Sequence, residues 1–194
     1  MDLNLDQETM RRTGYQVVDW LVDRIVELGE GPALRTATPQ EMRSRLSGDA
    51  PEDPRSLDSL LSRLQQDVLP FSGMWGHPRF FAYIPGIATW PGALADFVVA
   101  ACNLDASTWR EGAGLTRLEQ LVLEWVKEWL GYPAEAEGIL VSGGSAANLA
   151  ALACARQTLA AETHAKAVVY LSDQGHSSLA RGARLLGLEC SMTC

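Results

Sequence analysis

The N-terminal third of the chain has the apolar spacing of amphipathic helices. Between Met10 and Leu28, small or apolar positions recur at alternating spacings of four and three residues, which places them on one helical stripe. Asp6 precedes this stripe as an N-cap, and the glycines and proline at 29–32 end it. Thr38–Glu41 has the pattern of a capping box that opens a short helix, and Ser56 caps a leucine-rich helix that reaches Val68.

These three predicted helices offer one another too little apolar surface to form a core. Each stripe is narrow, and the connections are polar and contain proline, as in GDAPEDP at 48–54. A helical unit of about 70 residues usually needs support from another surface. We therefore expect it to lie on a larger domain or on a second subunit.

The pattern changes at Phe71. The run FSGMWGHPRFFAYIPG has neither a helical nor a strand period, and it predicts a packed, extended wall of aromatic side chains. An apolar helix is expected from Trp90 to about Asn103, followed by a loop that contains Ser107, Thr108 and Trp109. A long amphipathic helix is then expected to begin at 116–119 and to end at Gly131 and Pro133.

The last sixty residues alternate between strand and helix patterns. Apolar runs at 138–142 and 167–172 predict buried strands, and the segments 146–161 and 177–186 predict the helices that follow them. This order is typical of a parallel α/β sheet, although two such units are too few to close one. The final ECSMTC carries no clear pattern.

Composition excludes several classes of function. The net charge is −8 and the pI is about 4.9, which argues against a nucleic-acid surface. No apolar run is long enough for a membrane span, and MDLNLDQETMRR has charges where a signal peptide needs apolar residues, so we expect a cytoplasmic protein. The four cysteines form no CxxC pair, and we expect reduced thiols and no metal.

Two strand-to-helix turns carry candidate chemistry. In SGGSAANLAAL, Ser145, Ala146 and Ala147 should offer free N–H groups at a helix N-terminus, which is an arrangement that binds phosphate. A tight turn without a ligand is an equally good interpretation of this motif alone. In SDQGHSSLARGAR, His176 follows a buried strand at the edge where α/β sheets bind ligands, although a lone histidine is more often a cap or a surface group. Both turns should face one crevice.

The segment HPRFFAYIPG, taken together with these turns, resembles the group II pyridoxal-phosphate decarboxylases, of the aromatic-L-amino-acid decarboxylase type. The HPxFFAYxP block, the TxLE at 116–119, the SGGSxAN turn and the SDQxHSS segment stand in the family's order from about Leu5 to Leu186, after which the pattern is lost. The resemblance implies an α/β protein with an N-terminal helical arm, followed by the first, incomplete part of a fold-type I (aspartate aminotransferase-like) large domain. It implies a boundary between 1–86 and 87–194.

The resemblance also implies roles for particular residues. The turn at Ser145, Ala146 and Ala147 would hold the phosphate of pyridoxal 5'-phosphate, with Ala147 standing where relatives often have a hydroxyl. His176 would stack on the cofactor ring as a catalytic residue. The amino-acid substrate would contact the segment Tyr83, Ile84, Pro85 and Gly86. The full-length protein would be a homodimer whose arm packs across the partner subunit.

The Schiff-base lysine and the ring-binding aspartate of the family are expected downstream of this sequence. The chain has two lysines, Lys127 on a charged helix and Lys166 before a strand, and neither has the family's setting. Asp173 belongs to the histidine segment. We therefore expect a truncated or frameshifted carboxy-lyase that is inactive alone. Two alternatives stay open: a non-catalytic fragment that docks on a full-length homologue, and another fold-type I activity, such as an aminotransferase or an aldehyde-forming enzyme.

Overall fold

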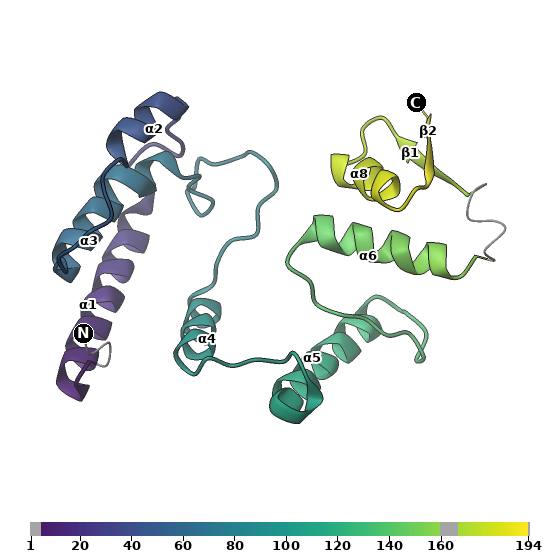
Figure 1. Cartoon of the computed structure of the whole chain (residues 1–194), viewed down its shortest axis with the longest axis horizontal. Helices are drawn as coiled ribbons and strands as arrows, with labels where there is room; N and C mark the ends of the chain where they lie inside the picture. The colour runs from purple at the N-terminus through teal and green to yellow at the C-terminus, as the bar shows by residue number, and fades with distance from the viewer. Residues whose placement is uncertain (1–4, 160–166, 194) are drawn as a thin grey trace. The chain divides into compact units, whose positions relative to one another are not determined.

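The computed structural model describes residues 5–159 and 167–193, which fall into two compact units divided after residue 100 (Figure 1). The predicted boundary at residue 86 between arm and large domain stays a prediction. Helix α4 (Trp90–Ala101) spans the division between the units. It was expected to reach Asn103, and its apolar side chains, such as Phe97 and Val98, are exposed.

The first unit contains the three predicted helices. Asp6 is the N-cap of helix α1 (Gln7–Val26), and its carboxylate accepts a hydrogen bond of 2.8 Å from the amide of Thr9. Helix α2 (Pro39–Arg45) has a complete capping box between Thr38 and Glu41. Helix α3 (Leu57–Arg63) continues through a π-helical turn at 64–68 and a 3-10 turn at 69–71.

Helices α1 and α3 lie side by side in Figure 1, and polar contacts join them. Gln16 of α1 donates to Asp58, and the indole of Trp20 donates to Gln65 at 3.3 Å. Among the described residues of this unit only His77 is buried. The unit therefore has little core of its own, as the narrow stripes of the sequence predicted.

The second unit begins with a longer helix than expected. Helix α5 (Trp109–Trp129) starts seven residues before the predicted TxLE, because Thr108 caps it by accepting a hydrogen bond from the amide of Glu111. The expected loop therefore ends at Thr108, and Trp109 is already helical. The helix is kinked at Gly112, and Gly131, with φ of +70°, follows its end.

The sheet is also arranged differently from the prediction. The expected strand at 138–142 forms no ladder in the described residues, and the side chains of Ile139 and Leu140 are 68% and 63% exposed. The amide of Leu140 donates instead to the carboxylate of Glu119 on α5 at 2.7 Å. A strand needs a neighbour for its amides and carbonyls, and periodicity cannot supply one.

Two parallel strands form the sheet that the structure describes. β1 (Val168–Ser172) is the predicted second strand, and it pairs with β2 (Glu189–Thr193), so that Val168 lies opposite Glu189. β2 lies in the segment for which the sequence showed no pattern. Helix α8 (Ser177–Leu185), close to the predicted helix at 177–186, forms the crossover between the two strands.

Helix α6 (Gly144–Gln157) packs against α8 in Figure 1, because small residues line the contact. The described helix ends before the predicted limit at residue 161, which lies outside the described residues. Gly182 is buried against α6, and a side chain there would approach the Cδ1 of Leu152 to 3.2 Å. With the buried Ala183, it lets the two helix backbones approach closely. This contact positions the two turns that carry the candidate chemistry.

Candidate functional site

The turn before α6 leaves the N-terminus of the helix without a side-chain cap. Gly143 is the N-cap residue with φ of +152°, a conformation that strongly favours glycine. Glycine has no side chain that could bond to the first amides of the helix, and none caps them. The partial positive charge of the helix end therefore stays available to an anion.

The free amides of this turn are not all those that the sequence predicted. The amides of Ala146 and Ala147 both donate to the carbonyl of Gly143, at 3.0 Å each. An N-cap carbonyl accepts the first bonds of its own helix, so the expectation of free N–H groups at these two residues was wrong. Within the described part of the chain, the amides of Gly144 and Ser145 donate no hydrogen bond. The cradle thus consists of these two amides and the hydroxyl of Ser145, which is exposed.

His176 stands at the start of α8, after the carboxyl end of β1, where the sequence placed it. Its Nδ1 accepts a bond of 3.2 Å from the amide of Ser178 and lies 2.8 Å from the hydroxyl of Ser178. That hydroxyl is also the acceptor for the side-chain amide of Asn148 on α6, at 2.8 Å. The imidazole itself is exposed, whereas Ser178 is only 3% exposed.

The bond between Asn148 and Ser178 brings the N-terminal turns of α6 and α8 together. Asn148 lies in the second turn of α6, three residues after Ser145, and Ser178 is the second residue of α8. Two helix N-termini and an exposed imidazole therefore lie within one small region of the second unit. Such a region suits a ligand that combines a phosphate with a flat ring, because it offers N–H donors for the one and an imidazole face for the other. The donor set thus fits pyridoxal 5'-phosphate.

The aromatic segment lies in the first unit and has an unusual backbone. Tyr83 and Ile84 have φ of +69° and +52°, and Ile84 is fully exposed. Positive φ is rare for a β-branched residue such as isoleucine. The ring of Tyr83 lies 6.3 Å from that of Trp75 and 6.4 Å from that of Phe80, in a cluster of three rings.

The buried His77 fastens the start of this segment. Its Nε2 donates to the carbonyl of Gly31 at 3.0 Å, since its Nδ1 accepts from the amide of Arg79 at 3.0 Å. The guanidinium of Arg79 donates to the same carbonyl at 2.9 Å. Pro85 is half-buried and Gly86 is exposed. The contact of Tyr83, Pro85 and Gly86 with a substrate stays a prediction.

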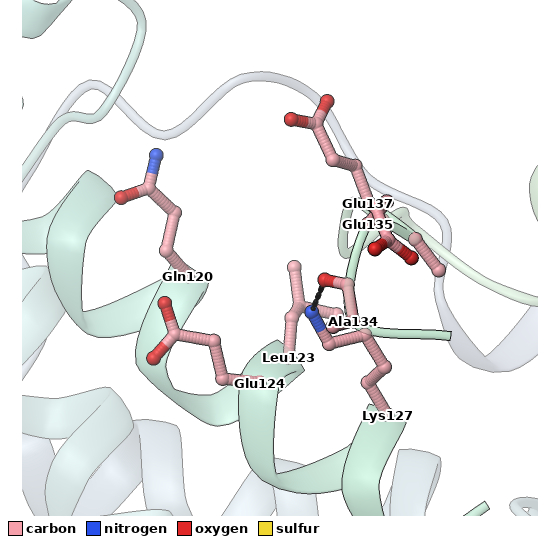
Figure 2. Close-up of a pocket in the computed structure, with 9 residues that line it drawn as sticks. Gln120, Leu123, Glu124, Lys127, Ala134, Glu135 and Glu137 are labelled. Carbon is pink, nitrogen blue, oxygen red and sulfur yellow. Dashed lines mark hydrogen bonds between the residues drawn. The ribbon is translucent and has the colours of Figure 1, made fainter. Parts of the chain in front are cut away.

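Neither lysine of the chain is placed at the cradle by the described contacts. A hollow of about 340 Å³ lies between α5 and the loop at 134–138. Figure 2 shows the residues that line it, among which the Nζ of Lys127 donates to the carbonyl of Ala134. Carboxylates of Glu124, Glu135 and Glu137 surround this hollow, and no cradle residue lines it. Lys166 lies outside the described residues.

The described helices include none that is long and apolar enough to cross a membrane. The residues that the structure describes also contain no cluster of three or more acidic, histidine or cysteine side chains that could hold a metal ion.

Parallel strands joined by a helix, with two helix N-termini next to an imidazole, define an α/β protein whose donor groups suit a phosphate. The conserved-domain model of the pyridoxal-dependent decarboxylases matches residues 39–193, and the chain belongs to this family. Pyridoxal phosphate is the family's cofactor. The match also extends beyond Leu186, so the expectation that the family pattern is lost there, on which the idea of a frameshift rested, was wrong.

Relatives and solved structures agree with this assignment. The chain is 37% identical over 193 residues to the aromatic-L-amino-acid decarboxylase of Bacillus atrophaeus, of which it covers 40%. It is 32% identical over 195 residues to tryptophan decarboxylase 2 of Oryza sativa, covering 95% of this chain and 39% of the relative. The chain therefore spans about 40% of the length of the curated relatives that it matches.

Two solved structures extend the comparison to the fold. Catharanthus roseus tryptophan decarboxylase in complex with L-tryptophan superposes with a TM-score of 0.83 at 26% identity, over 96% of this chain and 41% of that one. The 4-hydroxyphenylacetaldehyde synthase of Rhodiola rosea gives a TM-score of 0.86 at 25% identity, over 98% of this chain and 44% of that one. The predicted fold, the first part of a larger α/β domain after helical segments, is confirmed.

Sequence reasoning did not assign a role to Asn148 or Ser178. Both residues were inside the motifs that carried the resemblance, SGGSxAN and SDQxHSS. The missing information was their contact across two helices, which only the packing of α6 on α8 supplies.

Proposed function

We propose that this chain is the part of an amino-acid decarboxylase that holds the phosphate and one ring face of pyridoxal 5'-phosphate. The observation that carries the proposal is the uncapped N-terminus of α6 beside His176, linked through Asn148 and Ser178. The whole protein would remove CO2 from an aromatic or related L-amino acid. The bound cofactor supplies the electron sink for that reaction.

Each residue of the site has a defined task in this proposal. The amides of Gly144 and Ser145, with the Ser145 hydroxyl, bind the phosphate, and the dipole of α6 favours its charge. Ala146 and Ala147 shape the turn through their bonds to Gly143. His176 contacts the cofactor ring and orients the substrate.

The aromatic segment supports the choice of an aromatic substrate. The ring cluster of Trp75, Phe80 and Tyr83 offers an apolar wall, and a substrate pocket is usually built from such walls with a few polar groups. Tyr83, Pro85 and Gly86 would contribute to it. The relatives include both decarboxylases and an aldehyde synthase. Whether the product is an amine or an aldehyde is tested separately, by product analysis of a full-length homologue.

A binding experiment tests the cradle. Pyridoxine 5'-phosphate has no aldehyde and cannot react with lysines, so its titration into the isotope-labelled chain reports non-covalent binding. We expect the amide signals of Gly144 and Ser145 to shift, and pyridoxine without the phosphate to leave them in place. A titration to millimolar concentration that moves neither signal would contradict the proposal.

We further propose that the isolated chain has negligible turnover, because neither of its lysines forms the covalent link to the cofactor. The bond from Lys127 to Ala134 supports this for one of them. Incubation with pyridoxal 5'-phosphate followed by borohydride should leave no stoichiometric adduct by mass spectrometry. A yellow chain with one reduced adduct at Lys127 or Lys166 would refute it.

A second candidate is an interaction role, and the exposed apolar surface favours it. The exposed apolar side chains lie in the aromatic segment, where Phe81 is 92% exposed, and on helix α4, where Phe97 is 63% exposed. We propose that a further polypeptide of the same family covers these surfaces, in a dimer. Co-expression with a full-length homologue should yield a mixed complex; two separate monomers in size-exclusion chromatography would count against it.

A further inference from the structure

The region around His176 contains a hydrogen-bond chain that starts on a different helix. Asn148 of α6 bonds to the hydroxyl of Ser178, which in turn lies 2.8 Å from Nδ1 of His176. A histidine that caps its own helix needs only the backbone amide of Ser178, and that bond is already present at 3.2 Å. The side chains of Asn148 and Ser178 therefore add something that capping does not require.

The protons of this chain can be placed by counting donors. The side-chain nitrogen of Asn148 can only donate, so the Ser178 oxygen is its acceptor. The single hydroxyl proton of Ser178 is then left for Nδ1 of His176, which also receives the backbone N–H. With two donors directed at it, Nδ1 must present its lone pair, and the proton of the neutral ring lies on Nε2.

The burial of Ser178 makes this arrangement of donors and acceptors costly to reverse. Its side chain is 3% exposed and lies between α6 and α8, out of reach of bulk water. A buried hydroxyl that lacks its hydrogen-bond partners destabilises the folded state, so the Ser178 hydroxyl keeps its bonds to both Asn148 and His176. The ring of His176, by contrast, is exposed, and within the described residues it forms hydrogen bonds only to Ser178.

We propose that Asn148 and Ser178 are positioning residues that fix both the tautomer and the ring plane of His176 relative to the cradle on α6. They act through His176 and do not touch the cofactor. Because Asn148 is three residues from Ser145 on the same helix, the phosphate donors and the imidazole are held by one connected structure. The inference deepens the proposed function and rests on it for its meaning, but the tautomer can be measured without any ligand.

The first measurement is on the unaltered chain. Long-range proton–nitrogen spectra, recorded above about pH 8 where imidazole is neutral, distinguish protonated from unprotonated ring nitrogens. The His176 signals are assigned by their loss in His176→Gln. We expect an unprotonated Nδ1 and a protonated Nε2. A proton on Nδ1, or signals averaged as in free imidazole, would overturn the proposal without the need of any variant.

Three variants then test which side chains are responsible. Ser178→Ala should lower the ratio of the Nε2–H to the Nδ1–H tautomer about fivefold, the effect of one ordinary hydrogen bond. Ser177→Ala is the matched control: the same change one residue earlier, at an exposed hydroxyl for which the structure gives no bond to His176. Asn148→Asp keeps the buried Ser178 hydroxyl but accepts its proton, and it should produce the same shift as Ser178→Ala. It also keeps the test valid if Ser178→Ala does not fold. Equal tautomer ratios in Asn148→Asp and Ser177→Ala would refute the hydrogen-bond chain from Asn148 through Ser178 to His176.

A ligand titration separates this inference from the proposed function. Pyridoxine 5'-phosphate should shift the amides of Ser145 and the ring protons of His176 in the unaltered chain. In Ser178→Ala or Asn148→Asp, the amide shift should remain and the ring-proton shift should fall. If the amides do not respond in any protein, the proposed function fails; if the ring protons respond equally in all, the positioning role fails.

Discussion

The kink of α5 at Gly112 provides a sharp test of the packing in the second unit. A Cβ added to Gly112 would lie 2.5 Å from the carbonyl oxygen of Asp105 and 2.7 Å from the Cα of Ala106. Both are backbone atoms, so no side-chain rotation relieves the contact. Gly114, two residues further along the same helix, has open space around the corresponding position. Gly112→Ala and Gly114→Ala are therefore the same chemical change in opposite surroundings.

The expected difference follows from two magnitudes. An alanine at an exposed helical position is more stable than glycine by about 1 kcal/mol, which is the gain expected for Gly114→Ala. Overpacking against an unyielding neighbour costs about 1–3 kcal/mol, which is the loss expected for Gly112→Ala. The loop is unyielding because Asp105 accepts bonds of 2.8 Å from both the amide and the hydroxyl of Ser107. The two variants should thus differ by about 2–4 kcal/mol in free energy of unfolding.

Two assays check this prediction. Urea unfolding, followed by circular dichroism, gives the difference in stability between the variants. The pKa of Asp105 gives a local reading: bonds from the hydroxyl and then the amide of Ser107 hold it below its ordinary value, because they stabilise the carboxylate. In Gly112→Ala the displaced loop should let that pKa rise toward the ordinary value. Equal stability of the two variants, with an unchanged pKa of Asp105, would refute the close approach of Gly112 to the loop at 105–106.

Three further results are expected. Ala147→Ser restores a hydroxyl near the cradle and should tighten binding of pyridoxine 5'-phosphate about fivefold by fluorescence titration, whereas Ala151→Ser, an exposed position one turn further along α6, should not. Gly143→Ala forces alanine to φ of +152° and should cost about 1–3 kcal/mol in urea unfolding, while Gly144→Ala, which has open space, should cost less. The amide and then the hydroxyl of Thr38, the N-cap of α2, lower the pKa of Glu41. The stabilisation of α2 by Glu41 is therefore complete above the ordinary pKa and is lost as the pH falls through the lowered one. Amide exchange in α2 should show this pH dependence, and Glu41→Gln should remove it.

The local signals of the sequence were sufficient for most helices. Asp6, the capping box at Thr38 and the cap at Ser56 stand where the structure has them, because a cap bonds to amides only two or three residues away. The start of α5 was missed although it is also local. Thr108 and Glu111 form the same kind of cap, but the TxLE of the family resemblance drew attention to a position further along the helix.

The sheet depended on contacts that no local pattern records. The apolar run at 138–142 predicted a strand and forms none in the described residues, whereas the patternless segment at 189–193 pairs with β1 over five residues. Pairing requires a second backbone at the correct register, and the residues of one segment do not specify it.

By itself, the sequence determined the helices, the glycine turn before α6, and the position of His176 after β1, since each depends on neighbours within a few residues. The packing of α6 on α8 decided the rest of the site. It joined Asn148 to Ser178 and Ser178 to His176, and the helix geometry left Gly144 and Ser145, in place of Ala146 and Ala147, as the amide donors. The physical reason is that a hydrogen bond needs its donor and acceptor within about 3 Å, and for residues thirty positions apart only the tertiary structure sets that distance.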